Sequence, residues 1–268
     1  MPRDQRFVFL VQQFDIDVLR FDVVIFNALA NPSHDLGLGQ QASFEDQFGI
    51  LGSCRILLNE SVFQEVYVNL KPGQTEREVA LAIESIMMRQ GADAPAFPTI
   101  VAAGPNAALP HAIPTDRVIN PGETIIIDMG LKLDGYCSDM TRTVVLGAPD
   151  RKTVKIIRLV RQAQRAAIRT IEAGILARDA DRAARALISA AGYGKNFGHG
   201  LGHGVGLAVH ESPSLNRRRR NKLQPGMVVT VEPGIYLPGW GGVRLENMVV
   251  VEEKGCTVLN RDETFLDI

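Results

Sequence analysis

Two pairs of acidic residues interrupt apolar, β-branched segments of this chain, and the two pairs follow the same plan. Each pair begins after a Pro-Gly turn, with its first acid six residues beyond the glycine: Pro121-Gly122, Asp128 and Asp139 in one, and Pro225-Gly226, Glu232 and Glu246 in the other. The runs that precede the first acids predict buried strands. Several buried carboxylates close together are unstable unless cations neutralise them. The sequence therefore predicts a metal site.

Other matched segments indicate an internal duplication. Two amphipathic stretches of equal length, each bracketed by glycines, lie about a hundred residues apart: Gln74–Gln90 and Ile175–Ala191. In each half a phenylalanine, a histidine and then the Pro-Gly unit follow: Phe97 with His111, and Phe197 with His210. Several matches in the same order predict two halves related by a pseudo-twofold axis, each contributing two acids to one centre.

The composition is that of a soluble globular protein, with 268 residues, 46% apolar and 22% charged. A formal net charge of −1 provides no overall attraction to nucleic acid or to an anionic membrane. The basic run Arg217–Arg220 is expected to be a solvated surface turn rather than a binding patch. The first residues do not resemble a signal peptide, and three scattered cysteines predict thiols rather than disulfides. We therefore expect a cytoplasmic protein that binds neither nucleic acid nor membrane.

Helical and strand patterns alternate in blocks, which favours an α+β fold over a parallel βαβ sheet. Helices are expected at Phe44–Asn69, Gln74–Gln90, Arg151–Glu172 and Ala177–Ala191. Strands are expected at Thr99–Ala103, in a hairpin Thr124–Leu131 with Tyr136–Leu146, and at Met227–Tyr236 with Val243–Val251. Thr75 and Glu78 form a T-x-x-E capping box, and Gly91 fits a C-terminal cap. Phe7–Leu10 and Val23–Phe26 are strand-like.

The first hairpin allows two registers. If Leu131 pairs with Tyr136, Asp128 lies opposite Asp139; if the turn is only Asp134-Gly135, the two acids are diagonal. Both registers place the acids on one face of the sheet, because the residue offsets keep the same parity. Glu232 and Glu246 are expected to repeat this arrangement. Such hard oxygen ligands suit Mg, Ca or Mn.

A glycine-rich segment brings three of the five histidines within twelve positions, in His199–Gly206 with His210-Glu211 following. The glycines are expected to let the backbone approach a ligand closely. One imidazole among carboxylates moves the metal preference toward Mn, Co, Fe or Zn. The segment does not satisfy the dinucleotide pattern GxGxxG, and His210-Glu211 does not continue to HExxH, so nucleotide binding and a zincin are rejected.

Six strings of this chain resemble the pita-bread metallopeptidases, a family that includes aminopeptidase P, prolidase and methionine aminopeptidase. They are Leu109–Ala112, Ile127–Gly130, Gly135–Thr143, His199–Glu211, Val231–Tyr236 and Gly242–Glu246. The resemblance spans about Arg55 to Gly255 and is greater to the aminopeptidase P and prolidase branch. It implies two pseudo-symmetric αβ halves with a curved antiparallel sheet covered by helices.

The resemblance also implies two divalent metal ions, with manganese favoured and cobalt, zinc or iron as alternatives. Its implied ligands are Asp128, Asp139, His203, Glu232 and Glu246. Asp139 and Glu246 would bridge the two ions, Asp128 would complete one site, and His203 with Glu232 the other. A water between the ions would lose its proton near neutral pH and attack a peptide carbonyl.

Further roles follow from the same resemblance. The implied catalytic residues are His111, His210 and Glu232, and the implied substrate-binding residues are His111, His199, His210, Tyr236 and Arg244. Arg244 is expected to face away from Glu246. Two roles for it stay open: a salt bridge that steadies a ligand carboxylate, or contact with substrate.

The implied activity is hydrolysis of the Xaa-Pro bond at a free peptide N-terminus, by an aminopeptidase or dipeptidase. The alternatives are methionine aminopeptidase or another broader enzyme of this fold, a creatinase-like amidinohydrolase, and a non-catalytic binding module. Residues 49–268 are expected to be the metallopeptidase domain, and residues 1–48 a short N-terminal segment without an assigned role. Members of the branch usually carry a separate N-terminal domain that is not recognised here, so peptide-length selection and a homodimer stay open.

Overall fold

The computed structural model describes residues 44–261, with side chains from Arg55 onward. The chain divides into two units, Met1–Ile50 and Leu51–Ile268, and the second unit carries the elements discussed below except for the start of the first helix. The strands expected at Phe7–Leu10 and Val23–Phe26 lie outside the described residues. Within residues 44–261, none of the helices combines the length and the apolar character needed to cross a bilayer.

The first half contains two helices and six strands. In chain order they are α2 (Phe44–Asn69), α3 (Glu76–Arg89), β1 (Ala94–Pro95), β2 (Ile100–Ala103), β3 (Thr124–Met129), β4 (Leu131–Leu133), β5 (Tyr136–Cys137) and β6 (Met140–Val145). A 3₁₀ turn, η1 (Gly104–Ala108), follows β2. The strands pair antiparallel in the orders β2-β3-β6 and β1-β4-β5.

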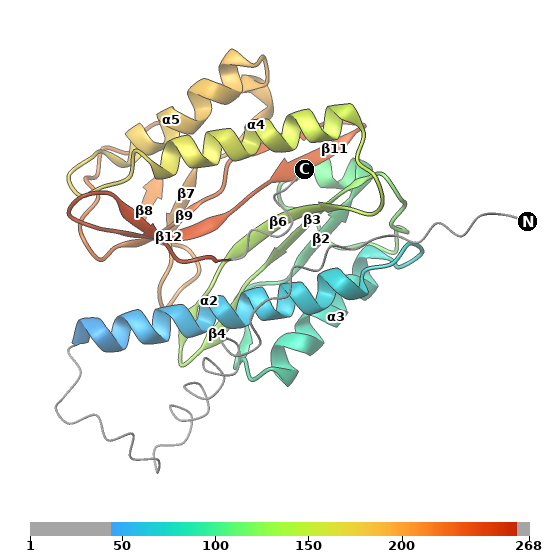
Figure 1. Cartoon of the computed structure of the whole chain (residues 1–268), viewed down its shortest axis with the longest axis horizontal. Coiled ribbons are helices and arrows are strands. Elements are labelled where there is room, and N and C mark those ends of the chain that lie inside the picture. Colours follow the sequence, from blue (N-terminus) through green and yellow to red (C-terminus); the bar gives the residue numbers. More distant parts are fainter. Residues whose placement is uncertain (1–43, 262–268) are drawn as a thin grey trace, which may run out of the picture. The chain divides into compact units, whose positions relative to one another are not determined.

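The second half repeats this plan. Its elements are α4 (Arg151–Ile168), α5 (Ala177–Ala190), η2 (Gly194–Asn196), β7 (Gly202–Gly204), β8 (Glu211–Leu215), β9 (Val228–Val231), β10 (Gly234–Leu237), β11 (Gly241–Arg244), β12 (Asn247–Val251) and β13 (Cys256–Val258). Its sheets have the orders β13-β12-β9-β7-β8 and β10-β11, again antiparallel. Figure 1 shows one helix pair on each side of the strands. The expected α+β class is thus confirmed.

The duplication is visible in the backbone hydrogen bonds. Gly73 N donates to Ile119 O at 3.3 Å, and Gly174 N donates to Leu223 O at 2.8 Å in the second half. Gly122 N donates to Leu146 O at 2.8 Å, just as Gly226 N donates to Val251 O at 2.8 Å. The helices α3 and α5 also have the same length, 14 residues each. The matching segments of the sequence therefore fold alike, as predicted.

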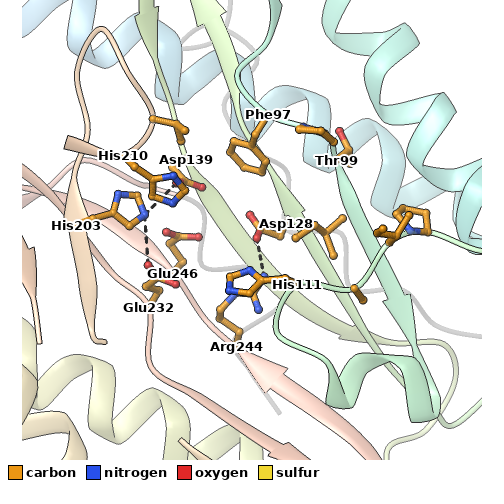
Figure 2. A pocket seen from close by; sticks show the side chains of 16 residues that line it. Phe97, Thr99, His111, Asp128, Asp139, His203, His210, Glu232, Arg244 and Glu246 are labelled. Carbon is orange, nitrogen blue, oxygen red and sulfur yellow. Dashed lines mark hydrogen bonds and ion pairs between the residues drawn. The ribbon is translucent and has the colours of Figure 1, made fainter. Parts of the chain in front are cut away.

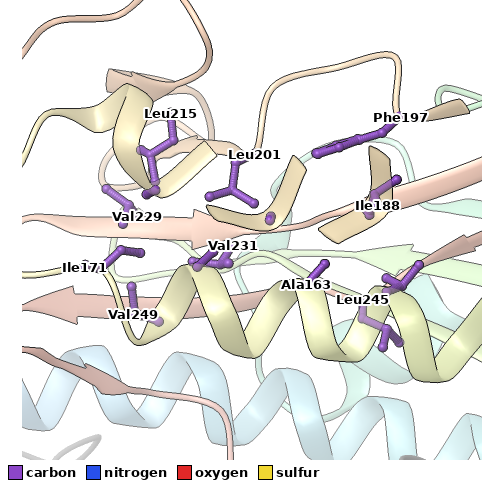
Figure 3. Close-up of a cluster of buried hydrophobic side chains, with 14 of the residues drawn as sticks. Ala163, Ile171, Ile188, Phe197, Leu201, Leu215, Val229, Val231, Leu245 and Val249 are labelled. Atoms are coloured by element: carbon purple, nitrogen blue, oxygen red, sulfur yellow. The ribbon is translucent and has the colours of Figure 1, made fainter. Parts of the chain in front are cut away.

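Each half buries one face of its strands against its own helices. On β3, alternate residues from Ile125 to Met129 pack into the cluster formed with α2 and α3. In the second half, β9, β11 and β12 pack against α4 and α5, and Figure 3 shows Val229, Val231, Leu245 and Val249 in this cluster. Because side chains alternate along a strand, the intervening residues must point to the opposite face. That face carries the acids.

Both predicted hairpins are interrupted where acids occur. The pairing of β3 with β6 stops after Met129, and β4 and β5 continue with β1 in a separate sheet. In the second hairpin the break comes at Pro233, which has no N–H to give to a ladder. The continuous strands expected at Thr124–Leu131 and Met227–Tyr236 are therefore wrong in their middle.

Helix ends follow the predicted capping chemistry. Thr75 Oγ1 accepts from Glu78 N at 3.2 Å, and Glu78 Oε2 accepts from Thr75 N at 2.8 Å, so the capping box is confirmed. The helix expected at Phe44–Asn69 is confirmed as α2. The helix expected at Arg151–Glu172 ends earlier, at Ile168, where turn hydrogen bonds replace the helical ones.

A matched pair of glycines allows the duplication to be tested energetically. Gly122 and Gly226 have φ values of +84° and +81°, and a Cβ at either would meet nothing within 4 Å. We expect Gly122→Ala and Gly226→Ala each to lower the free energy of unfolding by about 1 kcal/mol, through backbone strain alone. Gly198→Ala is the control, since Gly198 is equally open but not left-handed. Urea unfolding would contradict the duplication if only one of the two variants were destabilised.

Candidate metal centre

The four acids and three histidines named by the sequence surround one cavity of about 300 Å³ (Figure 2). The residues from this set that line it are Asp128, Asp139, Glu232, Glu246, His111, His203 and His210. Both halves contribute, because Asp128 lies on β3 and Asp139 just before β6, while Glu232 follows β9 and Glu246 precedes β12. The face opposite the helices is therefore where the two halves meet.

The two pairs of acids differ in register. On β3 and β6, Asp128 is the partner of Thr141, so Asp139 is diagonal to it, and the alternative with directly opposed aspartates is wrong. In the second half Val231 is the partner of Asn247, and the same register continued by one residue places Glu232 opposite Glu246. All four share a face, as expected, but only the glutamates face each other directly.

Three donor atoms already lie close enough for one cation. Asp139, His203 and Glu246 each offer a ligand atom, and these atoms lie within 4.8 Å of one another. His203 Nε2 also lies 3.4 Å from Glu232 Oε1 and 3.6 Å from Asp139 Oδ2. Asp128 has an oxygen, Oδ1, that is buried and has no hydrogen-bond partner. The cluster therefore could hold a divalent cation. Asp128, which lines the same cavity, has an oxygen that is free to bind a cation as well.

The charge state of His203 also favours a cation in this cluster. Its Nδ1 lies 3.1 Å from Gly204 O, and a carbonyl only accepts, so Nδ1 must carry the proton. Burial lowers the pKa of His203, which keeps the ring neutral. Its Nε2 lone pair then faces two carboxylates, an arrangement that is repulsive unless a cation lies between them.

Burial and mutual repulsion raise the pKa of three of the acids. Burial, and then the charges of Glu246 and Asp128, raise the pKa of Asp139 well above its usual range. Burial and Glu246 do the same for the pKa of Glu232. Burial, with Asp128 next, raises the pKa of Glu246 to about 7. Without cations, the folded chain therefore resists full ionisation of this cluster.

Arg244 lies inside the site, which corrects the expectation that it faces away from Glu246. Residues two apart on a strand share a face, and both Arg244 and Glu246 line the cavity while Val243 and Leu245 pack in the core. Arg244 Nη2 donates to Asp128 Oδ2 at 2.6 Å. Of the two roles left open, the salt bridge to an acid of the site is the one present in the structure.

Two of the expected substrate-binding residues, Tyr236 and His199, lie behind Arg244 and do not line the cavity. Arg244 Nη1 donates to the Tyr236 hydroxyl at 2.9 Å, and that hydroxyl lies 2.9 Å from His199 Nε2. Burial lowers the pKa of His199 to about 4, so its Nε2 is a neutral acceptor for the tyrosine proton. Arg244 Nη1 also donates to Pro110 O at 3.0 Å, and together these bonds orient Arg244 toward Asp128.

Sequence reasoning missed the side chains that join the two halves beneath the acids. Thr141 Oγ1 donates to Glu246 Oε2 at 2.6 Å, and Thr143 Oγ1 donates to Arg244 O at 2.8 Å. The buried Arg142 donates from Nη1 to Thr141 O and to Glu246 O. The alternation of side chains along a strand could have predicted the two threonines. Thr141 and Thr143 lie two and four residues beyond Asp139, on the same face.

The wall of the cavity was also missed. It is formed by mostly apolar residues from irregular segments and from the first position of β2: Phe97, Pro98, Thr99, Ile100, Ala112, Ile113, Pro114 and Val209. Two glycines near His203 lie against neighbouring backbone. A Cβ at Gly202 would lie 2.1 Å from Thr230 O, and one at Gly204 2.6 Å from Ser212 O. They therefore allow close packing of neighbouring strands, and the expected approach to a ligand stays a prediction.

Comparison with known proteins gives one consistent family. The model for metallopeptidase family M24 matches residues 56–253. An uncharacterised peptidase of Bacillus subtilis (strain 168) is 44% identical over 196 residues, 73% of this chain and 56% of the relative. A protein named Xaa-Pro dipeptidase from Pyrococcus horikoshii is 44% identical over 191 residues, 71% of this chain and 54% of the relative. The chain thus spans about half the length of these relatives.

Solved structures agree with this result. A prolidase from Pyrococcus furiosus superimposes with a TM-score of 0.78 at 40% identity, covering 82% of this chain and 65% of that one. An X-Pro aminopeptidase from Thermotoga maritima MSB8 gives a TM-score of 0.79 at 40% identity, covering 81% and 61%. The likeness therefore extends over most of the described residues.

The raised pKa values predict how metal-free protein responds to pH. Between about pH 4.5, the ordinary pKa of a glutamate, and 7, unfolded chains lose the Glu246 proton while folded chains keep it. Through Glu246, stability should then fall by about 1–3 kcal/mol as pH rises through this window.

Urea unfolding of chelator-treated protein at pH 5, 6, 7 and 8 measures this effect. Glu246→Gln should flatten the profile, whereas the exposed control Glu253→Gln should leave it unchanged. Equal slopes for the wild type and Glu246→Gln would show that Glu246 titrates normally.

Proposed function

The chain belongs to metallopeptidase family M24 and has its pita-bread fold, and from this premise we propose that it hydrolyses the Xaa-Pro bond at a peptide N-terminus. The observation that supports the proposal most is the convergence of four carboxylates, two buried and two partly buried, and a neutral imidazole on one cavity. Two relatives named Xaa-Pro dipeptidase, from Pyrococcus horikoshii and Pyrococcus furiosus, support the substrate class.

The proposed metal ligands are the five residues expected from the sequence: Asp128, Asp139, His203, Glu232 and Glu246. Two divalent ions carry four positive charges, which the four carboxylates would cancel. The unpaired oxygen of Asp128 and the outward lone pair of His203 Nε2 suit this assignment. Mixed oxygen and nitrogen donors fit manganese, with cobalt, zinc and iron as alternatives.

When bound, such ions would supply an activated water and polarise the scissile carbonyl. The chain's own residues then position the reactants. Arg244 holds Asp128 through a 2.6 Å ion pair, and Thr141 holds Glu246, so two of the carboxylates keep fixed orientations. His111 and His210 line the cavity, and either could donate a proton to the developing oxyanion or to the leaving nitrogen. Tyr236 and His199 would act by orienting Arg244.

The cavity supports a short substrate. Its volume of about 300 Å³ is at the lower end of ligand pockets, and its wall is largely apolar. A proline ring is apolar and its amide lacks an N–H, so no donor would be left unpaired against that wall. Methionine aminopeptidase activity or a broader specificity is the second candidate, and no feature of the wall favours it. Cytoplasmic location and the division into residues 1–48 and 49–268 stay predictions.

Substrate choice is tested by measuring the turnover of three peptides, together with the metal content of the same protein sample. We expect turnover of Ala-Pro or Ala-Pro-Pro and little turnover of Met-Ala-Ser. Chelation should abolish activity, and added manganese or cobalt should restore it. Preference for Met-Ala-Ser would replace the proposal with the second candidate, and activity that survives exhaustive chelation would refute a metal mechanism.

Asp139→Asn tests the ligand assignment. Because Asp139 would bridge both ions, its loss should lower turnover at least about a hundredfold and reduce the bound metal measured by elemental analysis. Asp93→Asn, an exposed aspartate distant from the cavity lining, is the matched control and should change neither quantity. Full retention of both metals by Asp139→Asn would contradict the assignment.

A further inference from the structure

The basic run Arg217–Arg220 lies in a loop of the second half. The duplication gives this loop an equivalent in the first half, the loop around Thr115. Arg178 N donates to Arg219 O at 3.1 Å, as Arg77 N donates to Thr115 O at 3.0 Å in the first half. The isolated bridges Leu176–Lys222 and Thr75–Val118 continue the same match. The two loops therefore have the same backbone attachment, and their side chains can be compared position by position.

The comparison reveals a reversal of charge. In the first half Arg77 Nε forms an ion pair with Asp116 Oδ1 at 2.8 Å. The positions equivalent to Arg77 and Asp116 are Arg178 and Arg220, so the second half places two cations where the first has a pair. Among residues 44–261, no ion pair is found for Arg178 or for the run Arg217–Arg220. Arg178 also has a buried Nε without a hydrogen-bond partner.

The charge in this loop is concentrated against an acidic background. Six of the chain's 29 lysines and arginines lie here, which leaves 23 against 30 acids elsewhere: Arg178, Arg217, Arg218, Arg219, Arg220 and Lys222. All of them except the half-buried Arg178 are exposed. Like charges this close repel one another, so an anion of high charge density would stabilise the loop.

We propose that this loop, which we call the basic loop (Arg217–Lys222 with Arg178), binds a compact anion carrying adjacent phosphate groups. Guanidinium groups match phosphate oxygens in paired hydrogen bonds, and adjacent phosphates carry more charge per length than the carboxylates of an acidic peptide. A long nucleic acid fits less well, because outside the loop the chain has 30 acids against 23 lysines and arginines. The anion comes either from an inorganic polyphosphate or from the phosphate chain of a nucleotide.

The basic loop is separate from the catalytic cavity. Strand β8 lies between His210, which lines the cavity, and Asn216, which begins the loop. Five extended residues span roughly 17 Å. Changes in the loop should therefore alter anion binding without changing peptide turnover, so failure of this proposal is distinguishable from failure of the proposed function.

The test is calorimetric titration of the metal-loaded full chain with inorganic tripolyphosphate, adenosine triphosphate and a single-stranded oligonucleotide, at low salt. The four-fold variant R217Q/R218Q/R219Q/R220Q should weaken tripolyphosphate binding about 30-fold or more, with peptide turnover within about twofold of wild type. The matched control removes four exposed charges elsewhere, in Arg151, Lys155, Arg169 and Lys254. Polyphosphate can also chelate the bound metals. This effect is the same in the four-fold variant and in the control, so a difference between them reports binding to the basic loop.

A second variant uses the first half as its template. Arg220→Asp restores the charge pattern of Arg77 with Asp116, so it should raise the midpoint of thermal unfolding by roughly 1–3 °C and weaken tripolyphosphate binding about tenfold.

Similar affinities for tripolyphosphate and adenosine triphosphate would support recognition of the phosphate chain. Tighter binding of the nucleotide would support the same recognition with an added contact to the base. Unchanged affinity in the four-fold variant, no detectable binding to wild type, or preference for the oligonucleotide would each overturn the proposal.

Discussion

Repulsion among buried carboxylates is the constraint on which the rest of this structure depends. Four acids share a cavity in which Arg244 forms an ion pair with Asp128, while the neutral His203 presents a lone pair to its neighbours. The fold holds this arrangement in place by packing and hydrogen bonds, and it leaves the electrostatic cost to be removed by cations. Stability and cofactor binding are therefore properties of the same few side chains.

The duplication explains how the acids come together without being neighbours in sequence. Each half buries one strand face against its own helices, so the opposite faces, which bear the acids, must be covered by the other half. The join is polar: Thr141, Arg142 and Thr143 on β6 bond to the segment that contains Arg244 and Glu246. A shift of one half would thus displace a carboxylate and its supporting hydroxyl together, which ties the geometry of the site to the interface between the halves.

Much of this was predictable because it depends on periodicity and chemistry. The α+β class, the matched helices and the shared face of the acids all follow from patterns local to the chain. What failed required knowledge of distant segments. The break after Met129 depends on β1, which pairs with β4, and the apolar wall around Ile113 and Val209 comes from irregular segments without a period. The orientation of Arg244 was predictable from parity, and the expectation was wrong because that rule was misapplied.

The two halves also show how one backbone plan can carry different chemistry. The same hydrogen bonds attach the loop around Thr115 to α3 and the loop around Arg219 to α5. In the first half that loop balances its charges, through Arg77 with Asp116, and its start at Pro114 borders the cavity. In the second half the same attachment carries uncompensated arginines. Since the same backbone hydrogen bonds attach both loops, their side chains were free to diverge, one toward the peptide cavity and the other toward an anion at the surface.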